Sequence, residues 1–379
     1  MKINYIFIIV IVINFISFIA GNQFYDNQFG SSCPCSDQSL CNPVSVGPRK
    51  EFLGFSLDNL TYPYYDWSIL TTIAVFYSPI VNELLCTAHS HDVRLVYGVS
   101  YPITQLGNST FQDEWIQDQL NLVQSTYTDG LNFDVESPIV NETLSQLYTN
   151  LVAETNKAFK AVNPFYQVTV DVAWSPNCID KRCYDYLGLS QASDFLIMMD
   201  YDERSQVFSD QCIASANSPP QLALAGIKNF TNLGISVDKL VMGLPWYGYN
   251  YPCISSPAGL YSEVCNIPLV PFRGANCSDA AGSQLNYGVI MSMLSDPSVV
   301  RGPLMWDHTL QSPYFNFYDP TSGNPHQMWF DDPQSIMVKV QLGKKLRLRG
   351  VAVWNIDFLN NEFESQSMDM WNSIGSFFS

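Results

Sequence analysis

Short runs of apolar and β-branched residues recur eight times along the chain. Runs that are apolar almost throughout are typical of strands buried on both faces, as in parallel sheets. Between most of them the apolar residues follow helical spacing, as in residues 115–128 and 144–162. Strands and helices that alternate in this way predict an α/β fold of the (β/α)8 type, a TIM barrel. The eight runs are residues 51–57, 70–76, 94–100, 130–136, 167–174, 195–202, 239–248 and 350–358.

The stretch between the seventh and eighth runs is too long for a single helix. Residues 251–332 are rich in Pro, Gly, Tyr and Phe and contain one helical segment, residues 288–296. We interpret this stretch as a lobe inserted at the rim of the barrel. No internal repeat or low-complexity linker indicates a second independent domain, so we expect one catalytic barrel domain over residues 21–379.

The first 20 residues have the layout of a secretory signal peptide. Lys2 is followed by an apolar run to Ile19 and then by the small residues Ala20 and Gly21. A signal anchor is the alternative, because the run approaches the length that spans a bilayer. Asn14 interrupts the run and small residues follow it directly, which favours cleavage. No other stretch is long and apolar enough to span a bilayer, so we expect the mature chain to be soluble. We also expect it to be a monomer.

A secretory route changes how the ten cysteines are interpreted, because disulfides form in an oxidising compartment. Proximity in the sequence makes Cys178–Cys183 and Cys253–Cys265 plausible pairs. The Cys-Pro-Cys motif and the single His-x-His lack the spacing of a zinc site, so we expect no metal and no cofactor. Five glycosylation sequons fit the same route. They begin at Asn59, Asn108, Asn141, Asn229 and Asn276.

Composition narrows the class of partner. The chain has 379 residues, of which 47% are hydrophobic, so it can bury a large core. A net charge of −17 argues against nucleic acid and against anionic membrane surfaces, whose phosphates call for an excess of Lys and Arg. The same charge is compatible with an acidic compartment and with a neutral ligand such as a sugar.

The fourth run, within "DGLNFDVES", carries unexpected polar residues. Asn132, Asp134 and Glu136 alternate with apolar residues, so they share one face of the strand. Active sites of TIM barrels lie at the carboxyl ends of the strands, where the two acids fall. A purely structural alternative is that the acids cap the next helix or pair with Arg. Stacking two acids and an amide on a buried face is unfavourable, which favours a function.

The physical chemistry of this pair suggests acid catalysis. Repulsion between neighbouring carboxylates makes Glu136 a candidate to keep its proton and deliver it to a leaving oxygen, as glycosidic cleavage requires. Aromatic residues at other strand ends could stack on sugar rings, although core packing is the alternative for each. They are Trp174, Tyr201, Trp246, Tyr247 and Trp354.

These motifs resemble those of glycoside hydrolase family 18, the chitinase family. "DGLNFDVE" resembles the signature D-G-x-D-x-D-x-E, with Asn132 where most members have Asp. "MDYD" at residues 199–202 resembles the M-x-Y-D motif of strand six, and Trp354 matches the Trp at the end of strand eight. Longer segments, among them "CPCSDQSLC", "VTVDVAWSP" and "PFRGANCSDAAG", resemble the lysosomal branch of this family, in which the second acid is also Asn.

The resemblance implies a retaining mechanism in which the 2-acetamido group of the substrate is the nucleophile. Glu136 is implied as the acid and then the base, and Asp134 as the carboxylate that holds the acetamide N–H. Tyr201 and Asp202 are implied to bind and orient the acetamide, and Trp354 to form the floor under the sugar. Asn132 and Asp129 are expected to organise the hydrogen bonds beneath Asp134. Trp246 is expected to contact substrate.

The resemblance also implies a substrate and a location. The substrate is an oligosaccharide with the N,N'-diacetylchitobiose core of free Asn-linked glycans, cut at its reducing end in the lysosome. One alternative is a secreted chitinase or endo-N-acetylglucosaminidase with the same chemistry. Another is a catalytically weak chitin-binding lectin, but such proteins typically lose the acid, and Glu136 is present.

Overall fold

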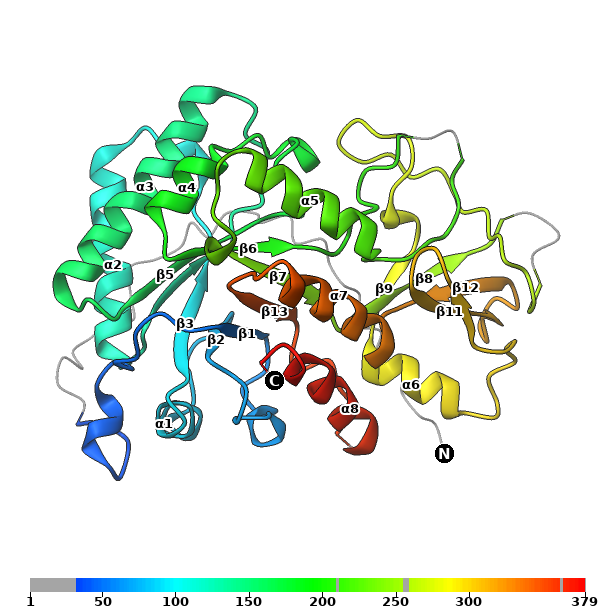
Figure 1. Cartoon of the computed structure of the whole chain (residues 1–379), viewed down its shortest axis with the longest axis horizontal. Coiled ribbons are helices and arrows are strands. Elements are labelled where there is room, and N and C mark those ends of the chain that lie inside the picture. The colour runs from blue at the N-terminus through cyan, green and yellow to red at the C-terminus, as the bar shows by residue number, and fades with distance from the viewer. Residues whose placement is uncertain (1–31, 209–210, 255–258, 362–363, 379) are drawn as a thin grey trace. The chain divides into compact units, whose positions relative to one another are not determined.

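Eight parallel strands close into a barrel in the computed structural model, which confirms the predicted fold class (Figure 1). The structure describes residues 32–208, 211–254, 259–361 and 364–378, so the signal-peptide prediction lies outside the described residues. Around the barrel the order is β1-β13-β7-β6-β5-β4-β3-β2. These strands are β1 Glu51–Ser56, β2 Thr72–Val75, β3 Arg94–Val99, β4 Gly130–Phe133, β5 Gln167–Ala173, β6 Phe195–Met199, β7 Leu240–Pro245 and β13 Gly350–Trp354.

The barrel strands are buried because helices cover their outer face. Every residue of β1, β5, β6 and β7 is buried. Several of the helices begin at a side-chain cap: Asn108 accepts a hydrogen bond from the backbone N–H of Phe111, and Asn141 accepts one from Leu144. The covering helices are α1 Asn82–Ser90, α2 Ser109–Ser125, α3 Glu142–Val162, α4 Tyr186–Ala192, α5 Pro220–Asn232, α7 Pro333–Lys345 and α8 Glu364–Gly375.

The start of β4 requires glycine. Gly130 has φ of +145°, and a Cβ atom built on it would lie 1.9 Å from the carbonyl oxygen of Gln167 in β5. Only a residue without a side chain lets the two strands approach at this point. The glycine of the "DGLNFDVE" segment therefore has a structural role: it allows β4, the strand that leads to the two acids, to pack closely against β5.

The inserted lobe is an antiparallel sheet of five strands in the order β10-β11-β12-β8-β9. It begins at Tyr247, inside the run that the sequence assigned to the seventh strand, rather than near Tyr251. The expected helical segment, residues 288–296, corresponds to α6 Tyr287–Ser295, shifted by one residue. The strands of the lobe are β8 Tyr247–Pro252, β9 Ser283–Asn286, β10 Met305–Asp307, β11 Ser312–Tyr318 and β12 Pro325–Trp329.

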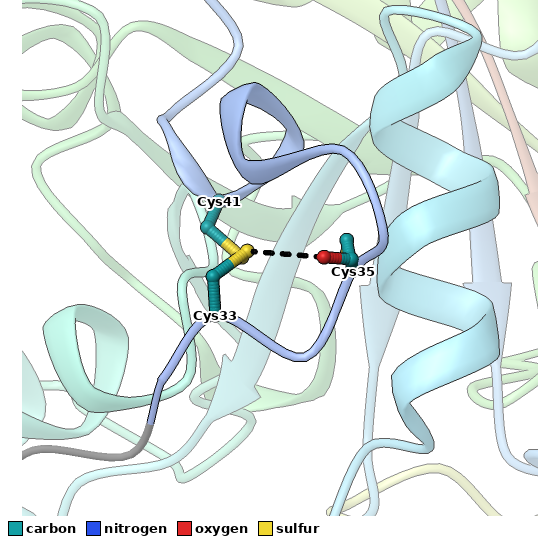
Figure 2. Close-up of side chains that lie close together, drawn as sticks. All are labelled: Cys33, Cys35 and Cys41. Atoms are coloured by element: carbon teal, nitrogen blue, oxygen red, sulfur yellow. Dashed lines mark hydrogen bonds between the residues drawn. A yellow bond between two sulfur atoms is a disulfide. The ribbon is translucent and has the colours of Figure 1, made fainter.

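All ten cysteines form disulfides, and both predicted pairs, Cys178–Cys183 and Cys253–Cys265, are confirmed. Figure 2 shows the Cys33–Cys41 bridge beside Cys35. These three sulfur atoms lie within 4.8 Å of one another, but each belongs to a disulfide and offers no thiolate to a metal. The other pairs are Cys35–Cys86 and Cys212–Cys277. Within the described ranges, no helix is both long and apolar enough to cross a membrane.

Candidate active site

A cavity of about 320 Å³ lies at the carboxyl ends of the barrel strands, where residues from the barrel and from the lobe meet. Aromatic side chains and carboxylates line it together, which is a suitable surface for a sugar with apolar and polar faces. The barrel contributes Asp134, Glu136, Asp171, Trp174, Asp180, Arg182, Met199, Tyr201, Asp202, Ser205 and Trp354. The lobe side contributes Phe272, Arg273, Asp279, Ala280 and Gln284.

The polar row predicted on the fourth strand is present. Asn132 is fully buried and donates hydrogen bonds to Thr169 Oγ1 and Asp171 Oδ1, both at 3.0 Å. Strand β4 ends at Phe133, so the two acids extend beyond it into the cavity. The sequence therefore located the acids, but it did not identify Asp171 of β5 as their neighbour.

The two acids of the row have different surroundings. Burial, reinforced by the charge of Glu136, raises the pKa of Asp134 to about 8, while the charge of Arg182 opposes this. Within the described part of the chain, the buried Oδ1 atom of Asp134 has no hydrogen-bond partner. Burial and the charge of Asp134 also raise the pKa of Asp171 well above its usual range. At mildly acidic pH Asp134 and Asp171 are therefore mostly neutral, which removes much of the cost of burying them.

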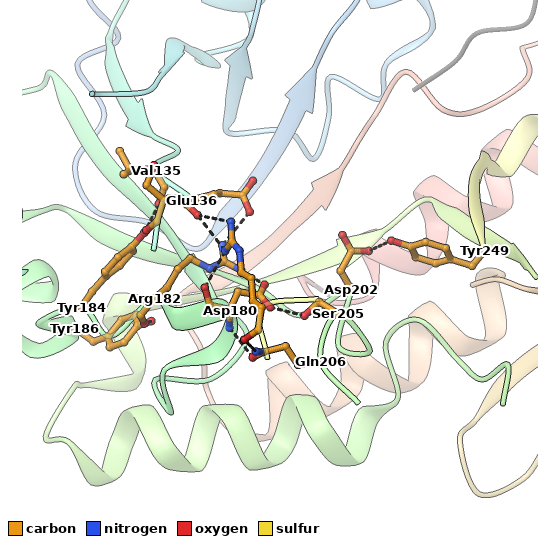
Figure 3. A network of polar contacts seen from close by, with 12 residues as sticks. Val135, Glu136, Asp180, Arg182, Tyr184, Tyr186, Asp202, Ser205, Gln206 and Tyr249 are labelled. Atoms are coloured by element: carbon orange, nitrogen blue, oxygen red, sulfur yellow. Dashed lines mark hydrogen bonds and ion pairs between the residues drawn. The ribbon is translucent and has the colours of Figure 1, made fainter. Parts of the chain in front are cut away.

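Glu136 is held by an arginine that sequence reasoning did not identify. Arg182 Nη1 lies 2.9 Å from Glu136 Oε2, and its Nη2 lies 2.9 Å from Asp180 Oδ2 (Figure 3). The Glu136 side chain is 56% exposed, whereas that of Arg182 is 6% exposed. The pairing with Arg that was the structural alternative is thus real, but it occurs inside the cavity. Of the two acids, Asp134 is the one that burial keeps protonated, whereas Glu136 has a cation beside it.

Residues after β6 form the second wall of the site. Tyr201 is 7% exposed and lines the cavity next to Asp202. Asp202 Oδ1 accepts hydrogen bonds from Tyr247 Oη at 2.5 Å and Tyr249 Oη at 2.8 Å. Burial raises the pKa of Asp202 to about 6, against the lowering effect of these two hydrogen bonds. The lobe thus fixes Asp202 through the tyrosines of β8, a role that the sequence did not reveal.

The aromatic candidates divide between cavity and core. Trp354 is partly exposed, lines the cavity and packs its ring against Phe55 at a centroid distance of 5.3 Å. Trp174 also lines the cavity. Trp246 does not: it is fully buried and packs edge-on against Trp371 of α8, with ring centroids 4.9 Å apart. The expectation that Trp246 contacts substrate is corrected, because its side chain points into the layer between barrel and α8.

Asp129 does not lie beneath Asp134. It precedes β4, at the opposite end of the barrel from the cavity, and its Oδ2 lies 2.9 Å from His89 Nε2. Its carboxylate also accepts hydrogen bonds from the backbone N–H groups of Val44 and Leu95, at 2.8 and 2.7 Å. The expectation for Asp129 is therefore wrong, because the carboxylate instead ties the N-terminal segment and α1 to the barrel.

The comparisons with known proteins agree with this geometry. The model of the family "Glycosyl hydrolases family 18" matches residues 101–358. "Probable di-N-acetylchitobiase 2" of Dictyostelium discoideum is 60% identical over 91% of this chain and 91% of that protein. Di-N-acetylchitobiase of Mus musculus is 42% identical over 90% of this chain and 92% of that protein.

A solved structure shows the same fold at low identity. A class V chitinase of Nicotiana tobaccum superposes with a TM-score of 0.69 and 17% identity, covering 87% of this chain and 100% of that one. The relatives are similar over nearly the whole described chain, and the matched family segment contains both acids and the wall after β6. The chain therefore belongs to glycoside hydrolase family 18.

Proposed function

We propose that this protein is a lysosomal glycosidase that hydrolyses the GlcNAcβ1-4GlcNAc core of free Asn-linked oligosaccharides and removes the reducing-end GlcNAc. Relatives with 42% and 60% identity carry the name di-N-acetylchitobiase. The observation that carries the proposal is the pair Asp134 and Glu136, which faces one cavity together with Tyr201, Asp202 and Trp354. We regard the domain as one barrel over residues 21–379 with its inserted lobe.

In the first step Glu136 gives its proton to the glycosidic oxygen as the bond to the anomeric carbon breaks. The carbonyl oxygen of the 2-acetamido group attacks that carbon from the opposite side and forms a bicyclic oxazolinium ion. Asp134 accepts a hydrogen bond from the acetamide N–H. When it is ionised, it also stabilises the positive charge that develops on the oxazolinium ring. Burial raises the pKa of Asp134 to about 8, so the pair shares one proton that is held on Asp134. This proton passes to the Glu136 carboxylate, which then delivers it to the glycosidic oxygen and leaves Asp134 ionised.

In the second step Glu136, now a carboxylate, takes a proton from the attacking water. Water opens the oxazolinium ion from the face that the leaving sugar occupied, so the anomeric configuration is retained. The hydroxyl of Tyr201 donates a hydrogen bond to the acetamide oxygen, and Asp202 helps to orient the acetamide group. Trp354 packs under the sugar ring. Asn132 shares no proton with Asp134. Its hydrogen bond to Asp171 instead fixes the position of that neighbouring carboxyl group.

The compartment is proposed from the charge and the secretory features. A net charge of −17 and buried acids that are neutral in acid both fit a compartment of low pH. The sequon residues Asn108, Asn141 and Asn276 are exposed, so they are accessible to glycosylation.

Product analysis tests this proposal. Purified protein at mildly acidic pH is given a free glycan ending in GlcNAcβ1-4GlcNAc and, separately, a chitin oligomer with a blocked reducing end. We expect one GlcNAc to be released from the free reducing end while the blocked oligomer stays intact. Internal cleavage of the blocked oligomer would instead assign the protein to the chitinase or endo-N-acetylglucosaminidase type. Binding without cleavage of either substrate would assign it to the lectin type.

A further inference from the structure

Arg182 is held both at its backbone and at its guanidinium group. It directly follows the short 3-10 helix Ile179–Lys181, within the turn that the Cys178–Cys183 disulfide closes. Its backbone N–H donates to the carbonyl of Ile179 at 2.9 Å. At the other end, its guanidinium bridges Glu136 and Asp180 with two contacts of 2.9 Å. A planar guanidinium held by two carboxylates has little freedom to rotate away.

Asp180, the second carboxylate on this arginine, is itself held from three sides. Its Oδ1 accepts a hydrogen bond from Ser205 Oγ at 2.8 Å, and its backbone N–H donates to Gln206 Oε1 at 2.7 Å. Its carbonyl oxygen accepts from Arg273 Nη1 of the lobe, also at 2.8 Å. Figure 3 shows this network around Arg182. Segments following β5 and β6 and the lobe therefore converge on the arginine that binds Glu136.

The charged and titratable groups around Glu136 and Arg182 come from every wall of the cavity. Arg273 of the lobe is the second cation of this network. Tyr184 and Tyr186 contribute phenol groups from the segment after the turn, and Tyr201 contributes one from the end of β6. The carboxyl groups are those of Asp134, Asp171, Asp180, Asp202 and, from the lobe, Asp279. Because acids dominate this set, the charge of Arg182 strongly affects how protons are distributed among them.

We propose that Arg182 is a positioning residue that holds Glu136 through Oε2, leaves Oε1 free for the glycosidic oxygen, and sets the acidic pH range of the enzyme. The assignment rests on the proposed function. During the first step the proton leaves Glu136 for the departing oxygen and a carboxylate remains, which the guanidinium stabilises. The positive charge of Arg182 beside Glu136 therefore favours transfer of the proton to the departing oxygen. The same charge means that a lower pH is needed to keep the proton in the site.

The test compares Arg182→Gln with Arg182→Lys and with the control Arg94→Gln. Arg94 is also buried but lies at the start of β3, at the opposite end of the barrel from the cavity. The first readout is a carbon-13 NMR titration of the Asp134 carboxyl group, which needs no substrate. The second is the pH dependence of kcat/KM for release of GlcNAc, with kcat and KM measured separately.

In Arg182→Gln we expect the Asp134 titration and the alkaline limb of kcat/KM to move to higher pH by about 0.5 to 1 unit. We expect kcat in acid to fall at least about tenfold with KM changed less than about threefold. In Arg182→Lys we expect the alkaline limb of kcat/KM to return to its wild-type position, because the positive charge is kept. The full kcat is not recovered, because Lys lacks the planar guanidinium group with its two parallel donors. Arg94→Gln changes neither the limb nor the titration.

A folded Arg182→Gln protein with an unchanged Asp134 titration would overturn the inference. Failure of the proposed function is recognised separately, because the wild-type protein would then release no GlcNAc. The NMR titration would still decide whether Arg182 controls the proton in that case.

Discussion

At the scale of single residues, the site works by giving two carboxyl groups different surroundings. Asp134 is surrounded by protein, whereas Glu136 is more than half exposed and faces a guanidinium. The sequence predicted that Asp134 and Glu136 share one face, because alternation along a strand fixes the face that each residue occupies, but it did not predict their neighbour Asp171. It did not predict Arg182, because the arginine lies 46 residues further along, in an irregular turn. Trp246 was misassigned because an aromatic residue at a strand end can point either into the cavity or into the core.

Asp134→Asn tests the role of the buried acid. Asn keeps the shape but cannot become the negative charge that stabilises the oxazolinium ion, so we expect the hydrolysis rate to fall at least about 100-fold. Steady-state kinetics at mildly acidic pH measures this. Asp118→Asn, an exposed substitution on α2, serves as the control and should keep the wild-type rate. A loss no larger than that of the control would show that Asp134 has no part in the reaction.

At the scale of elements, all eight barrel strands could be read from the sequence, but the strands of the lobe could not. Barrel strands are buried on both faces and appear as continuous apolar runs. In β11, Pro313 and Asn316 interrupt the run, and Pro325 opens β12. Asn316 is nevertheless buried, because its amide donates to the carbonyl of Ser262 at 2.7 Å. Ser262 is distant in the sequence and meets Asn316 only in the folded protein. The residues of β11 taken alone therefore have the polar pattern of a loop.

Asp129 joins three elements, and its removal should affect stability rather than chemistry. Asp129→Ala leaves His89 and the N–H groups of Val44 and Leu95 without their carboxylate. We expect the free energy of unfolding to decrease by about 3 kcal/mol, as for a broken buried pair. Denaturant unfolding measures this. The folded variant should keep the wild-type kcat. A large loss of kcat in a fully folded variant would show that Asp129 takes part in the active site after all.

At the scale of the whole molecule, buried acids outside the cavity tie stability to pH. Asp200 and Glu203 are buried, and their carboxyl oxygens have no hydrogen-bond partner among the described residues. Lys339 of α7 lies nearby but already pairs with Asp331. Burial therefore raises the pKa of both Asp200 and Glu203 well above the usual range. Both groups are neutral in acid and resist ionisation in the folded state.

The sign of the pH effect follows from these raised pKa values. In the unfolded chain such acids ionise near pH 4, so their stabilising effect is complete below that pH. It is lost as the pH rises towards the raised folded pKa, at up to about 1.4 kcal/mol per pH unit for each group. We expect the melting temperature to be higher near pH 5 than near pH 8.

Asp200→Asn should reduce the difference in melting temperature between these two pH values, because the amide does not ionise. The exposed substitution Asp118→Asn should leave the difference unchanged. A melting temperature that rises from pH 5 to pH 8 would contradict this account of the buried acids.

The central claim is that Glu136 donates the proton that breaks the glycosidic bond. The most direct test is Glu136→Gln, with hydrolysis measured by GlcNAc release and binding measured by calorimetry at mildly acidic pH. Glu114→Gln, on the exposed face of α2, is the matched control. The account predicts a loss of about 1,000-fold or more in kcat, because Gln has no proton to give, with substrate affinity retained. Hydrolysis by Glu136→Gln at a rate close to that of the control would contradict it.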